Sequence, residues 1–165
     1  MQIVGDHLSQ AAINHKANPP EEDLFARSAF NRYYYGAFLV SRQFLKDTTG
    51  VTGLPHKSIP DYLTTTFQNQ LKRQLKDGER SGLMSKSNYS RLLDGLKKNV
   101  HLLTDLLSEA YRVRVLADYE PEVRVKPENQ TYRLGTATLS RANGWEGRAH
   151  LHCKNLRSIW SELGN

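Results

Sequence analysis

The chain of 165 residues contains a single cysteine, which excludes a disulfide-stabilised scaffold. It lacks any run of about 18 apolar residues, so no segment is expected to span a membrane. The first residues lack the basic and then apolar pattern of a secretion signal, and we expect the protein to stay in the cytoplasm. Apolar residues make up 38% of the chain, a low share that still suffices for a core. Together with the length, this composition predicts a single domain covering residues 1–165.

Positive charge is concentrated in one part of the sequence. The formal net charge is +6, and three acidic residues between positions 70 and 98 face eight basic ones, so this stretch accounts for +5 of the excess. Such a stretch can follow the phosphates of a nucleic acid, or it can be an ordinary solvated helix face, and both interpretations stay open. The candidate RNA- or anion-binding residues in it are Lys72, Arg73, Lys97 and Lys98.

Apolar residues recur with a helical period over most of the chain. The pattern predicts helices over residues 2–14, 22–46, 59–76, 86–119 and 138–163, separated by loops rich in Gly, Pro and polar residues. The segment 123–125 alternates but is too short to indicate a sheet. The expected fold class is therefore all-α, a four- to five-helix up-and-down bundle.

Arg114 breaks the pattern of the longest predicted helix. It lies about 20° from Leu103 around the helix axis, inside the apolar stripe, and Asp118 follows four residues later on the same face. The arginine either meets an anion in a cleft, or it forms a structural pair with Asp118 that closes the end of the bundle. Arg112 lies about 180° from Leu103 and should point to solvent, where it is a further candidate anion-binding residue.

Three segments resemble the motifs of HEPN domains. Residues 32–38, RYYYGAF, resemble the R-A-Y-Y-A-x-F core helix of that family, and residues 114–119, RVLADY, resemble its R-x-x-A-D-Y signature. The segment 145–149, WEGRA, is similar to the start of the final helix of these domains. The resemblance covers residues from about 22 to 163 and implies a helical bundle of HEPN type, often a homodimer.

The resemblance also implies functions. Many HEPN domains are metal-independent ribonucleases of prokaryotic defence, toxin–antitoxin and CRISPR-linked systems, and they frequently accompany a nucleotidyltransferase. Their arginine is followed four to six residues later by a histidine, which suits removal of the proton from an RNA 2′-hydroxyl. Here neither Arg112 nor Arg114 has such a histidine, since Ala117 and Tyr119 occupy the corresponding positions. The candidate catalytic set is thus Arg114, Asp118 and Tyr119, without the usual base.

Three hypotheses follow from this departure. The protein binds RNA or a nucleotide with a degenerate ribonuclease motif, or it is an active ribonuclease with rearranged residues, in which His152 is a candidate helper. Alternatively it is a non-catalytic subunit that docks onto a nucleotidyltransferase or a nuclease. No cofactor is expected.

The remaining reactive side chains are expected to be structural. His150 and His152 point about 200° apart on a helix, so no metal site is predicted there. Cys153 lies on the apolar seam of the last predicted helix and should pack in the core. Tyr34 faces the apolar stripe of its helix, and we expect Tyr33–Tyr35 to serve packing or a dimer contact more than base stacking.

Overall fold

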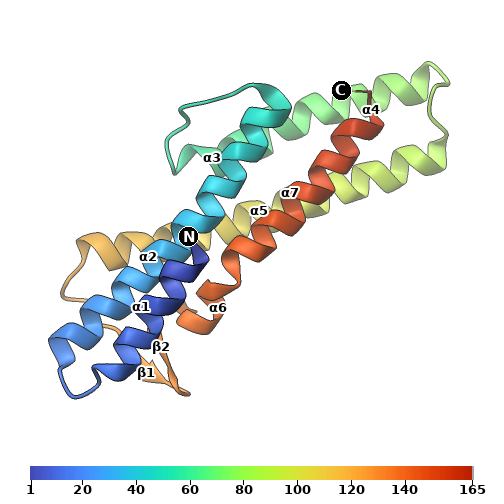
Figure 1. The fold of residues 1–165 in the computed structure, drawn as a ribbon. Coiled ribbons are helices and arrows are strands. Elements are labelled where there is room, and N and C mark those ends of the chain that lie inside the picture. The colour runs from blue at the N-terminus through green and yellow to red at the C-terminus, as the bar shows by residue number, and fades with distance from the viewer. Residues whose placement is uncertain (165) are drawn as a thin grey trace. The chain divides into compact units, whose positions relative to one another are not determined.

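The structure is a computed structural model that describes residues 1–164, and most of them are helical. The prediction of an all-α helical bundle is therefore confirmed (Figure 1). The long helices are α2 (Pro19–Thr49), α5 (Lys86–Tyr119) and α7 (Trp145–Glu162). The shorter ones are α1 (Gln2–Asn14), α3 (Ser58–Tyr62), the π-helical turn η1 (Leu63–Phe67), α4 (Gln68–Arg80) and α6 (Leu139–Asn143).

The chain divides into two compact units, whose boundaries fall within α2, α5 and α7. Unit 1 consists of Met1–Leu39 and Leu107–Arg148, and unit 2 of Val40–Leu106 and Ala149–Asn165. Each unit has its own set of buried apolar side chains. The single domain inferred from the length stays a prediction.

In unit 1, α1 lies alongside the first part of α2 (Figure 1). The contact is close at Gly5, where a Cβ atom would lie 2.5 Å from Cε1 of Tyr33. The Tyr33 hydroxyl donates to Asp6 Oδ1 at 2.8 Å, which fixes the two helices against each other. Phe30, Tyr34 and Trp145 are among the fully buried side chains of this unit.

Unit 1 also contains a small antiparallel sheet that the sequence did not predict. Its strands are β1 (Lys126–Glu128), β2 (Thr131–Leu134) and β3 (Ala137–Thr138), in that order across the sheet. Two-residue turns join them, and the residues at positive φ are Asn129, Gln130 and Gly135. Such turns match the twist of paired strands, so they form a hairpin even where the alternating pattern is short. The buried Tyr132 of β2 donates to Ala12 O and Glu22 Oε1, at 3.2 and 2.7 Å, and ties the sheet to α1 and α2.

In unit 2, α7 packs against η1 and α5, and η1 packs against α2. The Trp160 ring stacks on Phe67 with centroids 5.9 Å apart, and Phe67 meets the edge of Phe44 on α2 at 5.4 Å. On the α5 side, a Cβ atom at Gly95 would lie 3.4 Å from Cδ1 of Ile159. A four-element helical core results.

The predicted helix boundaries are partly right. The helices over 2–14 and 86–119 match α1 and α5 at both ends. The predicted helix over 59–76 is instead α3, η1 and α4 in succession, and that over 138–163 is broken at Gly144. Helix α2 begins at Pro19, because proline is tolerated in a first helical turn, where its missing N–H would be unpaired anyway.

Candidate functional site

The residues of the R-x-x-A-D-Y segment come together at the C-terminal end of α5. Arg114 Nε lies 2.8 Å from Asp118 Oδ2, and the Arg114 guanidinium carbon lies 4.9 Å from the centre of the Tyr119 ring. The Arg114 side chain is 15% exposed, whereas Tyr119 is 66% exposed. The Nε–H of Arg114 is not aligned with any acceptor among residues 1–164, so its contact with Asp118 is an ion pair.

Two residues of α2 complete this cluster, and neither was predicted. Asn31 Nδ2 donates to the other carboxylate oxygen of Asp118, and Tyr35 forms a hydrogen bond with Arg114. Burial lowers the pKa of Arg114, but hydrogen bonds with Tyr119 and Tyr35 and the charge of Asp118 outweigh it, so the pKa rises above its ordinary value. The guanidinium therefore stays charged, and the carboxylate of Asp118 on the same helix balances its charge.

This geometry favours the structural interpretation of Arg114 over the anion-binding one. Its carboxylate partner is present, and α2 holds that carboxylate from the other side. General-base removal of a proton near neutral pH needs a group whose pKa lies close to the working pH. The cluster of Arg114, Asp118, Tyr119, Asn31 and Tyr35 contains no histidine. His152 lies in unit 2, where its Nδ1 is 3.1 Å from Asn99 Oδ1.

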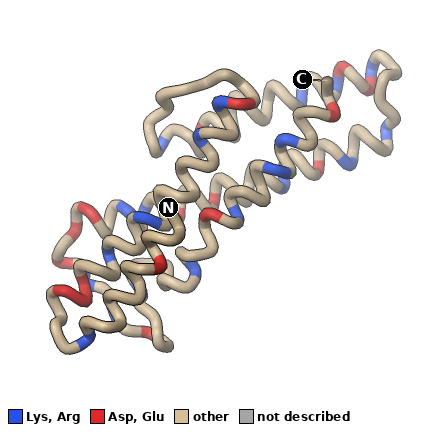
Figure 2. Tube along the Cα trace, viewed as in Figure 1, with Lys and Arg blue, Asp and Glu red and all other residues tan. Residues whose placement is uncertain are grey.

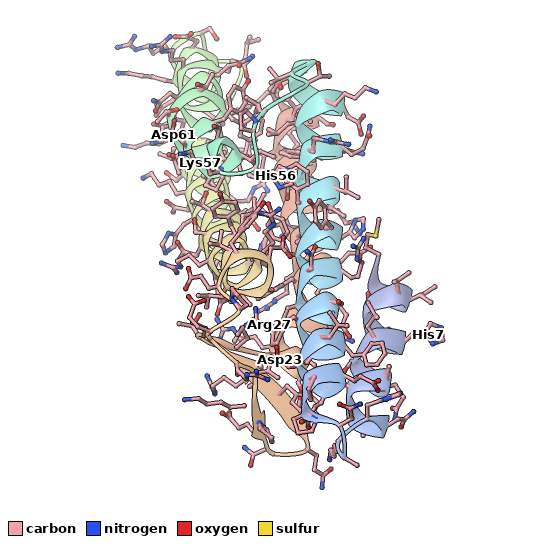
Figure 3. The ribbon with its side chains drawn as sticks, turned by 90° about the vertical axis from the view of Figure 1, so that its left-hand side faces the viewer. His7, Asp23, Arg27, His56, Lys57 and Asp61 are labelled. Atoms are coloured by element: carbon pink, nitrogen blue, oxygen red, sulfur yellow. The ribbon has the colours of Figure 1, made fainter. Side chains whose placement is uncertain are left out.

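A second buried arginine at the end of α5 was not singled out from the sequence. Arg27 of α2 is 8% exposed, and its Nε donates to Asp23 Oδ2 at 2.8 Å (Figure 3). Its remaining donors meet four main-chain carbonyl oxygens at and beyond the last turn of α5. These belong to Leu116, Ala117, Glu120 and Val123. Arg27 therefore satisfies carbonyl groups that every helix end leaves unpaired, and it holds the negative end of the helix dipole.

The other predicted anion-binding residues are not members of this cluster. Arg112 is exposed, as predicted, at the edge of a hollow of about 430 Å³ lined largely by apolar residues such as Val115 and Leu116. Arg73 is exposed on α4, and the half-buried Lys72 donates to Gln68 Oε1 at 3.2 Å. Lys97 and Lys98 are exposed on α5. These last four side chains all belong to unit 2.

Charge is distributed very unevenly between the two units. Unit 1 carries ten Lys and Arg residues and ten Asp and Glu residues, so its formal net charge is zero. Unit 2 carries thirteen basic and seven acidic residues, which gives it the whole excess of +6 (Figure 2). Four arginines of unit 1 form ion pairs with carboxylates: Arg27, Arg114, Arg133 and Arg141.

In unit 2 most cations have no such partner. Arg91 and Arg157 of this unit form ion pairs, with Glu162 and Asp47 respectively. Nine exposed cations of the unit have no carboxylate within ion-pair distance anywhere in the described part of the chain. They are Lys46, Lys57, Arg73, Lys76, Arg80, Lys86, Lys97, Lys98 and Lys154.

The structure also locates the other side chains considered from the sequence. Tyr33 and Tyr34 are 2% and 1% exposed and pack in unit 1, as expected. Cys153 is 6% exposed, which confirms its place in the core. From Met1 to Gly164, no three His, Cys, Asp or Glu side chains gather closely enough to hold a metal ion.

Arg114→Ala should lower the free energy of unfolding by about 1–2 kcal/mol, because it removes a half-buried ion pair and leaves Asp118 with one partner. Arg124→Ala is the matched control, since Arg124 is an exposed arginine of the same unit without an ion pair in the described part, and it should stay within about 0.5 kcal/mol. Urea denaturation measures both. Equal effects of the two substitutions would contradict the structural role of Arg114.

Cys153 should resist thiol reagents at pH 8. Burial raises the pKa of its thiol to about 12, against the smaller lowering effects of Ser41 and Arg157. The reactive thiolate is therefore almost absent from the folded protein at that pH. Labelling by an aromatic disulfide should follow the rate of opening, whereas a thiol placed at an exposed position of the same helix by Ser158→Cys should react at once. Rapid labelling of Cys153 in the unmodified chain would show that the core at this position is open.

Searches against protein-family models, curated proteins and solved structures found no match to this chain.

Proposed function

We propose that the protein binds RNA through unit 2 and that it is a HEPN-like protein of a prokaryotic defence or toxin–antitoxin system, acting in the cytoplasm. The observation that carries the binding role is the segregation of charge. Unit 2 has the entire net charge of +6 and nine exposed cations without a carboxylate partner in the described residues. Lysine and arginine side chains in this state are available to neutralise phosphates and release their counterions.

The choice of RNA over another polyanion rests on the resemblance to HEPN domains. In that family the arginine of the R-x-x-A-D-Y region belongs to a cleft that acts on RNA. In this chain the corresponding Arg114 is paired with Asp118, and its surroundings supply no base. The role that fits both observations is RNA binding without cleavage of the usual type.

Binding is tested with a fluorescently labelled, unstructured RNA whose anisotropy is followed at increasing salt. We expect binding at low salt that weakens steeply as salt rises, with a slope of about −0.7 for each phosphate that the protein neutralises. A DNA strand of the same sequence shows how much of the affinity depends on the 2′-hydroxyl. Absence of binding to RNA at low salt would refute the proposal.

The same protein incubated with RNA in the absence of metal ions should leave it intact. Cleavage that is lost in Arg114→Ala would instead establish the rearranged ribonuclease that the sequence left open. Cleavage that persists in Arg114→Ala would point to a contaminating nuclease, and unrelated preparations would reproduce it.

A homodimer is part of the proposal, and the hollow beside Arg112 is the surface that supports it. Arg112 on α5 and Glu120, which follows the last residue of that helix, both line this hollow, and Val115 and Leu116 lie between them along the chain. A two-fold axis through the apolar part would place each arginine opposite the glutamate of the second copy. Arg112→Glu should then give monomers in sedimentation, and Arg112→Glu combined with Glu120→Arg should restore the dimer.

A nucleotidyltransferase or nuclease partner, which the resemblance also implies, would be recognised by co-purification with the product of a neighbouring gene.

A further inference from the structure

The cations of α2 and α7 in unit 2 surround two adjoining hollows that the sequence did not indicate. The first has a volume of about 310 Å³ and lies between α2 and α7, where His150, Lys154 and Arg157 line it. The second, of about 260 Å³, lies between α2 and the following loop, and Arg42 and Lys46 line it. Gln43 lines both hollows, so they adjoin at this side chain, and we call the two together the α2–α7 groove.

We propose that the α2–α7 groove is a binding site for the phosphodiester backbone of single-stranded RNA. This inference rests on the RNA binding proposed above and identifies a part of unit 2 that performs it. Four Lys and Arg side chains, two from each helix, line the groove, while Asp47 is its single acidic residue. The groove therefore has an excess of positive charge.

Asp47, the one acidic residue that lines the groove, is already paired with other residues of the groove. Asp47 Oδ2 pairs with Arg157 Nη2 at 2.9 Å, and Asp47 Oδ1 accepts a hydrogen bond from Gln43 Nε2 at 2.6 Å. Asp47 thus holds Arg157 at the groove instead of opposing Lys46 and Lys154, which have no ion pair in residues 1–164. Both lysines are exposed and can reach an incoming phosphate.

The shape of the groove also suits a strand better than a compact ion. Along α7, residues 150 to 157 extend over about 10 Å, and along α2, residues 42 to 46 extend over about 6 Å. The floor of the first hollow is apolar and consists of Val40, Phe44 and Cys153, of which Phe44 and Cys153 are buried. A charged rim above an apolar floor is the arrangement with which proteins hold single strands, because phosphates meet the cations while sugars and bases cover apolar surface.

The test compares three double variants that each remove two exposed positive charges. Lys46→Gln/Lys154→Gln alters the groove, Lys97→Gln/Lys98→Gln alters the basic stretch predicted from the sequence, and Lys16→Gln/Lys126→Gln alters unit 1. Binding of labelled, unstructured RNA is measured over a range of salt, and thermal melting shows that each variant is folded.

We expect the groove variant to bind RNA on the order of tenfold more weakly at low salt, with a salt slope that is smaller by about 1.4, since each lysine contributes about 0.7. The unit 1 variant should bind like the unmodified chain. Asp47→Asn should strengthen binding, because it removes the negative charge of the groove while the amide oxygen can still accept a hydrogen bond from Arg157. Weaker binding by this variant would contradict the electrostatic argument.

The inference is overturned if the groove variant keeps the affinity and slope of the unmodified chain while Lys97→Gln/Lys98→Gln loses both. In that case RNA binding by unit 2 still stands, and its site is elsewhere in the unit. If the unmodified chain itself does not bind RNA at low salt, the proposed function and this inference fail together.

Discussion

Arg27→Met should lower the free energy of unfolding by about 3–5 kcal/mol, the usual effect of breaking a buried, hydrogen-bonded charge pair from one side. Methionine fills much of the same volume but offers no donor. The substitution would leave the Asp23 carboxylate without its arginine and would strip the end of α5 of its hydrogen-bond donors. The carbonyl oxygens affected are those of Leu116, Ala117, Glu120 and Val123. At about 2–4 °C per kcal/mol for a chain of this length, the melting temperature should fall by about 10 °C.

The matched control is Arg124→Met, which removes an exposed arginine from the same unit and should have little effect. Arg27→Lys distinguishes charge from geometry. A lysine keeps the positive charge but has three donors on one nitrogen, so it cannot reach Asp23 and the separate carbonyl groups together. It should recover only part of the loss. Full stability of Arg27→Met in urea denaturation would show that the end of α5 does not depend on this side chain.

Trp145→Ala should destabilise the protein by about 3–5 kcal/mol, because Trp145 is fully buried in unit 1 and its removal leaves a large cavity. Trp145→Phe should cost much less. The indole Nε1–H is buried and has no hydrogen-bond acceptor in the described residues, so losing it relieves a desolvation penalty of about 1–3 kcal/mol that offsets part of the lost packing.

The two variants are best compared by calorimetry and urea denaturation at equal concentration. The prediction is tested by the difference in stability between the two variants. Both lack the indole N–H, but phenylalanine keeps an aromatic ring in the core and alanine does not. If Trp145→Phe were as destabilising as Trp145→Ala, the Nε1–H would have to make a hydrogen bond that the folded chain described above does not contain.

Local sequence signals were sufficient for the helices whose ends they mark. The apolar seam of 86–119 continues on both sides of Arg114 and ends just before Pro121, so α5 was predicted at both ends. The sheet was missed, because its strands are two to four residues long and are held by turn geometry and by the Tyr132 contacts to α1 and α2. No window of the sequence contains those contacts.

The two arginines at the end of α5 show how far reasoning from one helix can go. Arg114 was recognised since it lies in an apolar stripe with an acidic partner four residues away, and the pair is present. Arg27 has the same features on its own helix, with Asp23 four residues before it, so the same argument would have identified it. Its carbonyl partners, however, lie about 90 residues further along the chain, and only the fold brings them near.

The location of the positive charge was likewise only partly predictable from the sequence. The sequence located most of the positive excess between residues 70 and 98, and those residues do belong to the positively charged unit. The cations of the α2–α7 groove escaped notice, because Lys46 and Lys154 are more than 100 positions apart and neither stands in a basic stretch. A surface formed by residues of two helices cannot be recognised from the composition of either segment alone.

The π-helical turn η1 allows the segment from Ile59 to Leu75 to bury every fourth residue. Those residues are Ile59, Leu63, Phe67, Leu71 and Leu75, and each is completely buried. In a regular α-helix a step of four turns the side chain by about 40°, so this series would rotate by about 160° away from the core. The wider turn at Leu63–Phe67 winds more slowly and counters that rotation. The run Thr64–Thr66 therefore holds one residue more than a regular helix needs, and deleting one of these threonines should leave a regular α-helix whose two halves still present the same face inward. In this segment the π-helical turn absorbs an extra residue without changing which side chains are buried.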